Sequence, residues 1–407
     1  MTQAVTGSRP RIVVVSEFVD ATRNSTGYYW RKIITGLARE GFEVAVISTA
    51  DSCNLAAPLG PNVSCHSTSI GQDSRSGGVK SYLLGQIQLT IGLALRTWKV
   101  LRRGDVLYCG TNPSFLLVIL ALFRRLLGFR WVLLVHDVFP ENAAAAGLTS
   151  QRSIRYRLAK ALFDRTYACP DALIAIGQDM LEVLSRKTRG RAQIHVIPNW
   201  ADVQEISTAL APSQQPLITR SHPDSVVFQY FGNFGRVQGL ELVLDAIHLV
   251  RHPRAEFVFI GGGALEAKVR EFVAQHPERR VRCLPSLAFG RNNEGLLACD
   301  VAMISLMPGM FGLAVPSKAY FSMAADKPLL VIGDVGAELQ RTVASHPGLG
   351  WFCEAGDPAA LARQIDEICD FDLAAIRGVP RRFVEQNHDW GQAIRRYIAV
   401  LWPDSVR

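Results

Sequence analysis

The sequence predicts two α/β domains, each built on a parallel sheet covered by helices and facing the other across a cleft. Three observations support this prediction. Short apolar runs alternate with helical stretches, as they do in parallel sheets. A polar segment, residues 204–225, interrupts this alternation, which then starts again. The chain of 407 residues is too long for one ordinary core, and its 48% hydrophobic content indicates large buried cores.

The first half begins with a strand, a helix and a second strand. Residues 11–15 (RIVVV) form a short apolar run typical of a buried parallel strand, and residues 28–40 have helical spacing. Further strands, separated by helical stretches, are expected at residues 42–48, 105–108, 130–135, 172–176 and 193–197. We therefore place a first domain at residues 1–207.

The pattern restarts after the polar segment. Strands are expected at residues 226–231, 256–260, 281–284, 301–305 and 329–332, and helices at 240–250, 264–274 and 317–325. This places a second domain at residues 208–385 and a C-terminal helix at 386–407. In such folds ligands bind at the carboxyl ends of the strands, so we expect the site in the cleft between the two domains.

Charge is distributed unevenly between the two halves. The net charge of residues 1–200 is +11, and that of residues 201–407 is −3. A basic half suggests an anionic partner, for which nucleic acid and an anionic membrane are both candidates. The longest apolar run, residues 115–123 (FLLVILALF), is too short to span a bilayer.

Residues 80–103 predict a basic amphipathic helix. Five apolar side chains fall on one helical stripe, and Arg96, Lys99 and Arg103 lie on an adjacent face. The stripe consists of Leu84, Ile87, Ile91, Leu95 and Trp98. Such a helix can lie on an anionic membrane, or it can be a surface helix that packs on its own sheet.

The eight cysteines are scattered along the chain. None belongs to a CxxC pair, and no histidine cluster has metal-ligand spacing. With no secretory signal recognised, we expect reduced thiols in a cytoplasmic protein.

A glycine loop opens the second domain. In YFGNFGRVQGLE, Gly232, Gly235 and Gly239 surround one cation, Arg236. Backbone amides between a strand and a helix favour an anion, and an arginine can form a bidentate pair with a diphosphate. The loop lacks the GxGxxG pattern of dinucleotide sites and the GK[ST] of P-loops. A plain strand–helix turn is the alternative.

Two further segments of the second domain predict phosphate contacts. The run Gly261, Gly262 and Gly263 ends the next strand, where it would form one wall of a nucleotide site or a simple turn. In VPSKAYFSM, Ser317 is a good helix cap, which places Lys318 at a helix N-terminus. A lysine is unfavourable there unless an anion lies nearby; a solvated lysine is the alternative.

The first domain contributes polar groups near the ends of its strands. His136 and Asp137 end an apolar strand in LVHDVFPEN, and Glu141 follows. His136 could face a sugar hydroxyl, or it could be a structural hydrogen-bond donor. Glu141 is the better candidate base for an acceptor hydroxyl. Gly27, which opens the first helix, would let the backbone approach a ligand in the cleft.

Together these segments resemble the family-4 type of GT-B glycosyltransferase, in particular the capsule, O-antigen and colanic-acid branch. GT-B enzymes have two Rossmann-like domains and a final helix that returns to the first. The resemblance runs from Ser16 to about Ala362. The matching segments are HDVFPENAAAAG, ALIAIGQDM, HVIPNWADV, FGNFGRVQGLELVLDA, FVFIGGG, VPSKAYFSMAADKP and GWFCEAGDPAALA.

The resemblance implies a nucleotide-diphosphate sugar in the second domain and an acceptor in the first. Transfer would retain the anomeric configuration and require no metal or other cofactor. The implied catalytic residues are His136, Asp137, Glu141, Arg236 and Lys318. The implied donor-binding residues are Gly27, Gly232, Asn233, Gly235, Arg236, Gln238, Gly261, Gly262, Gly263, Leu284, Ser317, Lys318 and Glu338.

The chain departs from the family pattern in two places. Asn233 and Gln238 stand where many members carry Arg and Lys. Many members also carry two glutamates seven residues apart, the second of which binds the ribose. Phe321 occupies the second of these places, and Glu338 is a candidate substitute.

The leading functional hypothesis is a membrane-associated transferase in surface polysaccharide synthesis. It would move a sugar from a UDP-sugar to a saccharide linked to polyprenyl diphosphate. Its basic first domain would make peripheral contact with the inner face of the cell membrane, with no nucleic-acid partner. The alternatives are a glycosyltransferase with a soluble natural-product acceptor and a non-catalytic partner subunit with the same fold.

Overall fold

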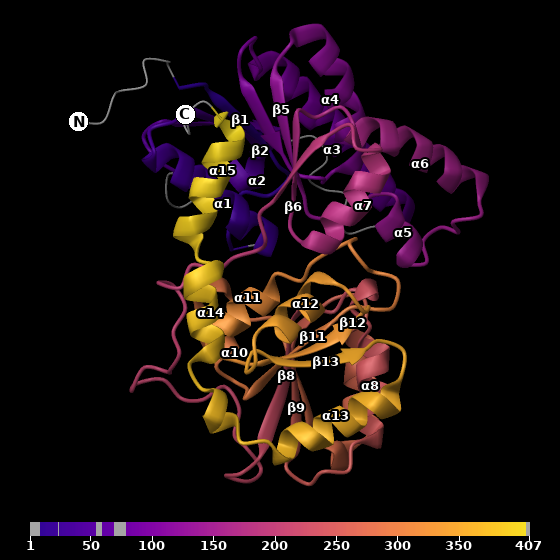
Figure 1. Ribbon diagram of the computed structural model, residues 1–407, viewed down its shortest axis with the longest axis vertical. Helices are drawn as coiled ribbons and strands as arrows, with labels where there is room; N and C mark the ends of the chain where they lie inside the picture. Colours follow the sequence, from indigo (N-terminus) through magenta and orange to yellow (C-terminus); the bar gives the residue numbers. More distant parts are fainter. Residues whose placement is uncertain (1–8, 23, 54–58, 69–78, 404–407) are drawn as a thin grey trace.

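Two parallel sheets, one in each half of the chain, organise the fold (Figure 1). The computed structural model describes residues 9–22, 24–53, 59–68 and 79–403. The first sheet has the strand order β3-β2-β1-β4-β5-β6-β7, and the second has the order β10-β9-β8-β11-β12-β13. The predicted fold class, two parallel α/β domains, is therefore confirmed.

The strands of the first sheet are β1 (Ile12–Val15), β2 (Val44–Thr49), β3 (Val63–Thr68), β4 (Val106–Cys109), β5 (Arg130–Val135), β6 (Ala172–Ala175) and β7 (Gln193–Val196). Its helices are α1 (Ser25–Arg39), α2 (Ala50–Cys53), α3 (Val79–Val100), α4 (Ser114–Leu127), α5 (Glu141–Ala145), α6 (Ile154–Tyr167) and α7 (Gln178–Thr188). Figure 1 shows α4, α6 and α7 on one side of this sheet and α1 on the other.

The strands of the second sheet are β8 (Val226–Asn233), β9 (Ala255–Gly262), β10 (Val281–Leu284), β11 (Val301–Ser305), β12 (Leu329–Gly333) and β13 (Gly350–Glu354). Its helices are α8 (Leu240–Leu249), α9 (Glu266–Gln275), α10 (Asn292–Leu296), α11 (Lys318–Ala324), α12 (Glu338–Ser345), α13 (Pro358–Asp370) and α14 (Val379–Asn387). The last helix, α15 (Trp390–Leu401), packs against α1 of the first domain.

The strands missing from the sequence prediction, β3 and β13, both lie at sheet edges. Most side chains of β3 are partly or fully exposed, and those of β13 are mostly half-buried. An edge strand covers less core than a central one, so neither segment reads as the continuous apolar run of a central parallel strand.

Helix α3 packs on the first sheet with a different face from its apolar stripe. It lies against β2 and β3 and buries Leu89 and Leu93. The stripe from Leu84 to Trp98 faces away, with Leu95 54% exposed and Trp98 44% exposed. The expectation of a helix on its own sheet therefore holds, but its apolar stripe remains uncovered. Among the described residues, no helix is long and apolar enough to cross a membrane.

One loop of the second domain, residues 309–316, is bonded to the first domain. The Val138 amide donates to the Leu313 carbonyl (3.1 Å), and Asp137 and Ala314 form an antiparallel β-bridge. The Asn199 side chain donates to the Val315 carbonyl (3.0 Å). This loop leads into α11, so main-chain bonds tie the start of that helix to the end of β5.

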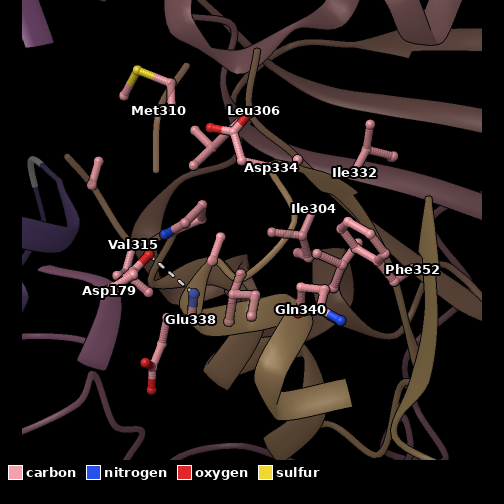
Figure 2. A pocket seen from close by; sticks show the side chains of 16 residues that line it. Asp179, Ile304, Leu306, Met310, Val315, Ile332, Asp334, Glu338, Gln340 and Phe352 are labelled. Atoms are coloured by element: carbon pink, nitrogen blue, oxygen red, sulfur yellow. Dashed lines mark hydrogen bonds between the residues drawn. The ribbon is translucent and has the colours of Figure 1, made fainter. Parts of the chain in front are cut away.

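A pair of carboxylates caps two helices across the domain boundary. The Asp179 carboxylate accepts the Glu338 amide at the start of α12 (3.0 Å), shown as a dashed line in Figure 2. The Glu338 carboxylate accepts the Gln178 amide at the start of α7 (2.6 Å). Burial raises the pKa of both carboxyl groups. Each helix N-terminus is thus neutralised by an acid of the other domain.

Candidate active site

A cleft of about 1010 Å³ separates the carboxyl ends of the two sheets. The first domain lines it with the N-terminal turn of α1 and with His136 and Asp137 after β5. The second domain lines it with the ends of β8 and β9 and with residues 314–318 before and at the start of α11. This is the place where the sequence predicts ligand binding.

The ends of β8 and β9 approach each other through glycine backbones. Gly232 has φ +131°, and no atom lies within 4 Å of the position a Cβ would occupy there. A Cβ on Gly261 would lie 1.9 Å from the Gly232 carbonyl oxygen, so that position excludes a side chain. Because Gly232, Gly261 and Gly262 all line the cleft, a ligand can approach bare backbone on this wall.

Lys318 is the single cation from Lys or Arg among the described residues that line the cleft. Its Nζ lies 3.6 Å from the centre of the Tyr230 ring and 3.3 Å from Gln238 Oε1. Within the described part of the chain it has no carboxylate partner. Burial lowers the pKa of Lys318 to about 7. A desolvated lysine held by neutral groups is ready to take an anion.

The neutral residues of the glycine loop hold this lysine. Gln238 Oε1 lies 2.8 Å from the Tyr230 hydroxyl, which also lies 3.0 Å from the Asn233 carbonyl oxygen. Asn233, Gln238 and Ser317 all line the cleft. The Gln238 side-chain amide therefore helps to position Lys318.

Six predicted donor residues lie outside the lining of the cleft, namely Gly27, Gly235, Arg236, Gly263, Leu284 and Glu338. Arg236 is exposed on the loop beside it, and its side chain has no hydrogen-bond or ion-pair partner among the described residues. Its reach to a ligand stays a prediction.

His136 and Asp137 bring two perturbed groups to the first-domain wall. His136 Nε2 is buried without a hydrogen-bond partner, and burial lowers the pKa of this imidazole to about 4. It is therefore neutral near pH 7 and can hydrogen-bond a ligand hydroxyl. Burial raises the pKa of Asp137 to about 6. A buried polar atom without a protein partner in a cleft marks a position where a ligand can hydrogen-bond.

Glu141 lies outside the cleft lining, in a cluster of ion pairs. Its carboxylate accepts from Lys187 Nζ (2.8 Å) and from Lys160 Nζ (2.7 Å). Lys187 also contacts Asp164 at 2.8 Å and is almost fully buried. Glu141 thus joins α5 to α6 and α7, and both its oxygens are already in use.

Gly27 and Glu338 are likewise engaged in packing and capping. A Cβ on Gly27 would lie 2.1 Å from the Asp20 carbonyl oxygen, so this glycine lets α1 pack on the preceding loop. The neighbouring Ser25 and Thr26 line the cleft instead. Glu338 caps α7 through the Gln178 amide. It also lines a smaller apolar cavity beside the cleft, whose side chains are shown in Figure 2.

Phe321 connects the two domains at the edge of the cleft. Its ring lies 5.4 Å from that of Tyr28 and 6.1 Å from that of Tyr29, both on α1. The carboxylates among the described cleft residues are Asp137 and Glu205. Glu205 already contacts Lys32 and the Tyr28 hydroxyl. Asp137 lies at the end of β5 in the first domain, so among the described residues no carboxylate of the second domain lines the cleft in place of the ribose-binding glutamate.

Several cleft residues escaped sequence reasoning because they belong to loops or first turns of helices that no motif marks. These are Thr22, Asn24, Tyr28, Tyr29, Glu205, Ser286, Asn292 and Asn293. Only Asn24 carries a sequence signal, as the cap of α1: its side chain accepts the Gly27 amide.

Comparison with known proteins identifies the family. Residues 26–205 match the family model "Glycosyltransferase Family 4", and residues 225–370 match "Glycosyl transferases group 1". The chain is 42% identical, over 97% of its length and 98% of the relative's, to the probable glycosyltransferase WbjE of Pseudomonas aeruginosa. This chain is a glycosyltransferase.

A more distant relative and two solved structures extend the likeness. The glycosyltransferase is 21% identical, over 75% of each chain, to the putative colanic acid biosynthesis glycosyl transferase WcaI of Escherichia coli K12. Its fold resembles that of sucrose-phosphate synthase from Thermosynechococcus elongatus, with a TM-score of 0.76 and 16% identity over 96% of this chain and 98% of that one. Anabaena HepE, solved with UDP-glucose, has a TM-score of 0.66 and 17% identity, over 97% of this chain and 99% of that one. The fold is therefore GT-B.

Proposed function

We propose that this glycosyltransferase moves a sugar from a UDP-sugar to a saccharide linked to polyprenyl diphosphate, with retention of the anomeric configuration. The observation that carries the donor half of the proposal is Lys318. It is the single Lys or Arg side chain in the described lining of the cleft, and no described carboxylate pairs with it as a counter-charge. A diphosphate supplies that counter-charge.

The donor diphosphate would lie between the glycine loop and Lys318. The backbone at Gly232 and Gly261 is open to the cleft, and Gln238 and Ser317 add neutral polar groups. Arg236, exposed on the loop itself, would approach the same diphosphate from outside the cleft lining. UDP is the proposed nucleotide because HepE, a protein of the same fold, was solved with UDP-glucose.

Transfer breaks the bond between the anomeric carbon and the diphosphate and forms a bond to the acceptor oxygen on the same face of the sugar. Negative charge then accumulates on the leaving diphosphate, next to Lys318. A fixed cation in a desolvated site stabilises such charge more than water does. The acceptor hydroxyl proton passes to the leaving diphosphate. His136, neutral and unpartnered, would hold a hydroxyl of the donor sugar.

The acceptor would enter from the first domain. The names of WbjE and WcaI, one of them a colanic acid enzyme, support a saccharide acceptor in polysaccharide synthesis. A lipid-linked form of that saccharide is the further step of the proposal. A soluble acceptor is the alternative class.

Three measurements test the proposal. A thermal-shift screen of UDP, GDP, ADP and dTDP should show stabilisation by UDP, since a ligand that binds only the folded state raises the melting temperature. Transfer from radiolabelled UDP-sugars should then label the lipid extract of membranes. Label found only in water-soluble products would favour a soluble acceptor. NMR of the product linkage tests retention, since an inverted anomeric configuration would refute it.

A further inference from the structure

The outer surface of three first-domain helices carries most of the exposed apolar side chains. Twelve of the fifteen large apolar side chains that are exposed among the described residues lie between Leu84 and Leu162. We call this surface the apolar face. It consists of Leu84, Ile87, Ile91, Leu95 and Trp98 on α3, Phe115, Leu122 and Leu126 on α4, Leu148 before α6, and Ile154, Leu158 and Leu162 on α6.

The apolar face is a property of these helices and not of the whole helical layer. Helix α7 packs beside α6 in the same layer (Figure 1), yet its exposed positions include Gln178, Glu182 and Arg186. By contrast, Leu126 is 72% exposed and Leu158 is 65% exposed. Soluble helices normally turn polar residues outward, so these apolar positions need a partner.

Ring contacts join the three helices into one continuous surface. Trp98 on α3 meets Phe123 on α4 at 4.9 Å, and Phe115 on α4 meets Phe163 on α6 at 5.8 Å. Phe115 also meets Phe139 at 6.1 Å. Phe139 follows Asp137 by two residues, so the apolar face extends to the loop that lines the cleft.

Cations surround the apolar face, and acids are missing from it. Exposed basic residues on or beside α3, α4 and α6 are Arg96, Lys99, Arg102, Arg103, Arg125, Arg152, Arg155, Arg157 and Arg165. None of these side chains has an ion-pair partner among the described residues. Asp105, between α3 and α4, is paired with Arg11. Asp164, on α6, is paired with Lys160 and Lys187.

We propose that the apolar face docks on the surface of a bilayer that contains anionic lipid. Apolar side chains flanked by unpaired cations match an acyl layer beneath anionic headgroups. A second copy of the chain is a poorer occupant, because a symmetric contact would bring these cations together. The inference deepens the proposed function, since it places the first-domain side of the cleft next to the membrane that would hold a lipid-linked acceptor.

Vesicle sedimentation tests the proposal without any activity measurement. The full-length protein is mixed with vesicles of phosphatidylcholine, with and without about one-third phosphatidylglycerol, at 50 mM and 500 mM NaCl. We expect binding to the anionic vesicles at low salt and at least about tenfold weaker binding at high salt or without phosphatidylglycerol. Leu95→Glu combined with Leu158→Glu should weaken binding at least about tenfold.

Matched variants separate the apolar face from general surface effects. Leu249→Glu changes a leucine of similar exposure (45%) on α8 of the second domain and should bind vesicles like the wild type. Lys99→Gln with Arg103→Gln should lose affinity, whereas Arg251→Gln with Arg396→Gln should not. Circular dichroism confirms that each variant is folded.

Three results would overturn the docking proposal. The wild-type protein could stay in the supernatant with anionic vesicles at low salt, or the Leu249→Glu control could lose as much vesicle binding as the variants of the apolar face. The third is a concentration-dependent dimer that Leu95→Glu abolishes. Vesicle binding without any UDP response would instead retain the docking surface and refute the proposed donor.

Discussion

Lys318 makes a sharp prediction about how nucleotide binding depends on pH. Burial lowers the pKa of its ammonium from 10.5 to about 7, so above pH 7 the free protein holds Lys318 increasingly as the neutral amine. A diphosphate beside Nζ favours the ammonium and restores its pKa toward the usual value. Binding therefore takes up a proton, and the affinity for UDP falls as pH rises above 7.

The size of the effect follows from these values. Moving a lysine pKa from 10.5 to about 7 disfavours the charged form by roughly 5 kcal/mol, which is an upper limit on what a bound anion recovers. If the pKa in the complex is 10 or more, the Kd for UDP increases about fiftyfold between pH 7 and pH 9. At pH 8 each UDP takes up about 0.9 proton. Ionisation of UDP itself contributes little to the pH dependence of the Kd between pH 7 and 9, because its terminal phosphate ionises near pH 6.

Isothermal titration calorimetry measures both quantities. Titrations at pH 7, 8 and 9, each in two buffers of different ionisation heat, give the Kd and the number of protons. Lys318→Met keeps the length of the side chain and should bind UDP about 30- to 1000-fold more weakly at pH 7, with no pH dependence up to pH 9. Lys268→Met, at an exposed lysine of the same domain, is the matched control. A wild-type Kd that changes less than twofold between pH 7 and 9 would refute the assignment of Lys318 to the diphosphate.

Four further predictions concern other residues of the two domains. Arg236→Ala should lower kcat/KM by the equivalent of about 2–4 kcal/mol while the protein stays folded; near-normal turnover would remove its diphosphate role. His136→Ala should lower kcat about 100-fold and leave the Kd for UDP within threefold, as separate turnover and binding assays can check. If Phe321 stands where the family resemblance places a ribose-binding glutamate, UDP and 2′-deoxy-UDP should bind within about threefold of each other; a tenfold preference would reveal another ribose ligand. Asp179→Ala leaves the amides of Met180, Gly312 and Glu338 without their acceptor and should lower the free energy of unfolding in urea by about 2–4 kcal/mol, whereas Asp224→Ala, on the linker, should not.

The layout of strands and helices was largely accessible from the sequence because central parallel strands are continuous apolar runs. The edge strands β3 and β13 were not, since partly exposed strands lack that signal. The apolar stripe of α3 illustrates a second limit. Helical spacing shows that Leu84 to Trp98 share one face, but only the packing of Leu89 and Leu93 on the sheet shows that this face points outward.

The site was accessible where a motif marks the end of a strand or the start of a helix. His136, Gly232, Gly261 and Lys318 all line the cleft. Residue type alone could not show whether a carboxylate is already engaged in an ion pair or a helix cap. Glu141 and Glu338 are acids in suggestive positions, yet one is held by lysines and the other by a helix N-terminus of the first domain. Tertiary contacts decide which acid is free, and a linear pattern does not encode them.

The geometry of the candidate site depends on the bonds that close the two domains. Asp137 pairs with Ala314, and Val138 donates to the Leu313 carbonyl, four and five residues before Lys318. The group that would face the donor sugar and the group that would hold its diphosphate are therefore joined by a short stretch of bonded main chain. Breaking these bonds by opening the cleft would also separate His136 and Asp137 from Lys318. The bonds that join the two domains therefore also hold the two halves of the proposed site together.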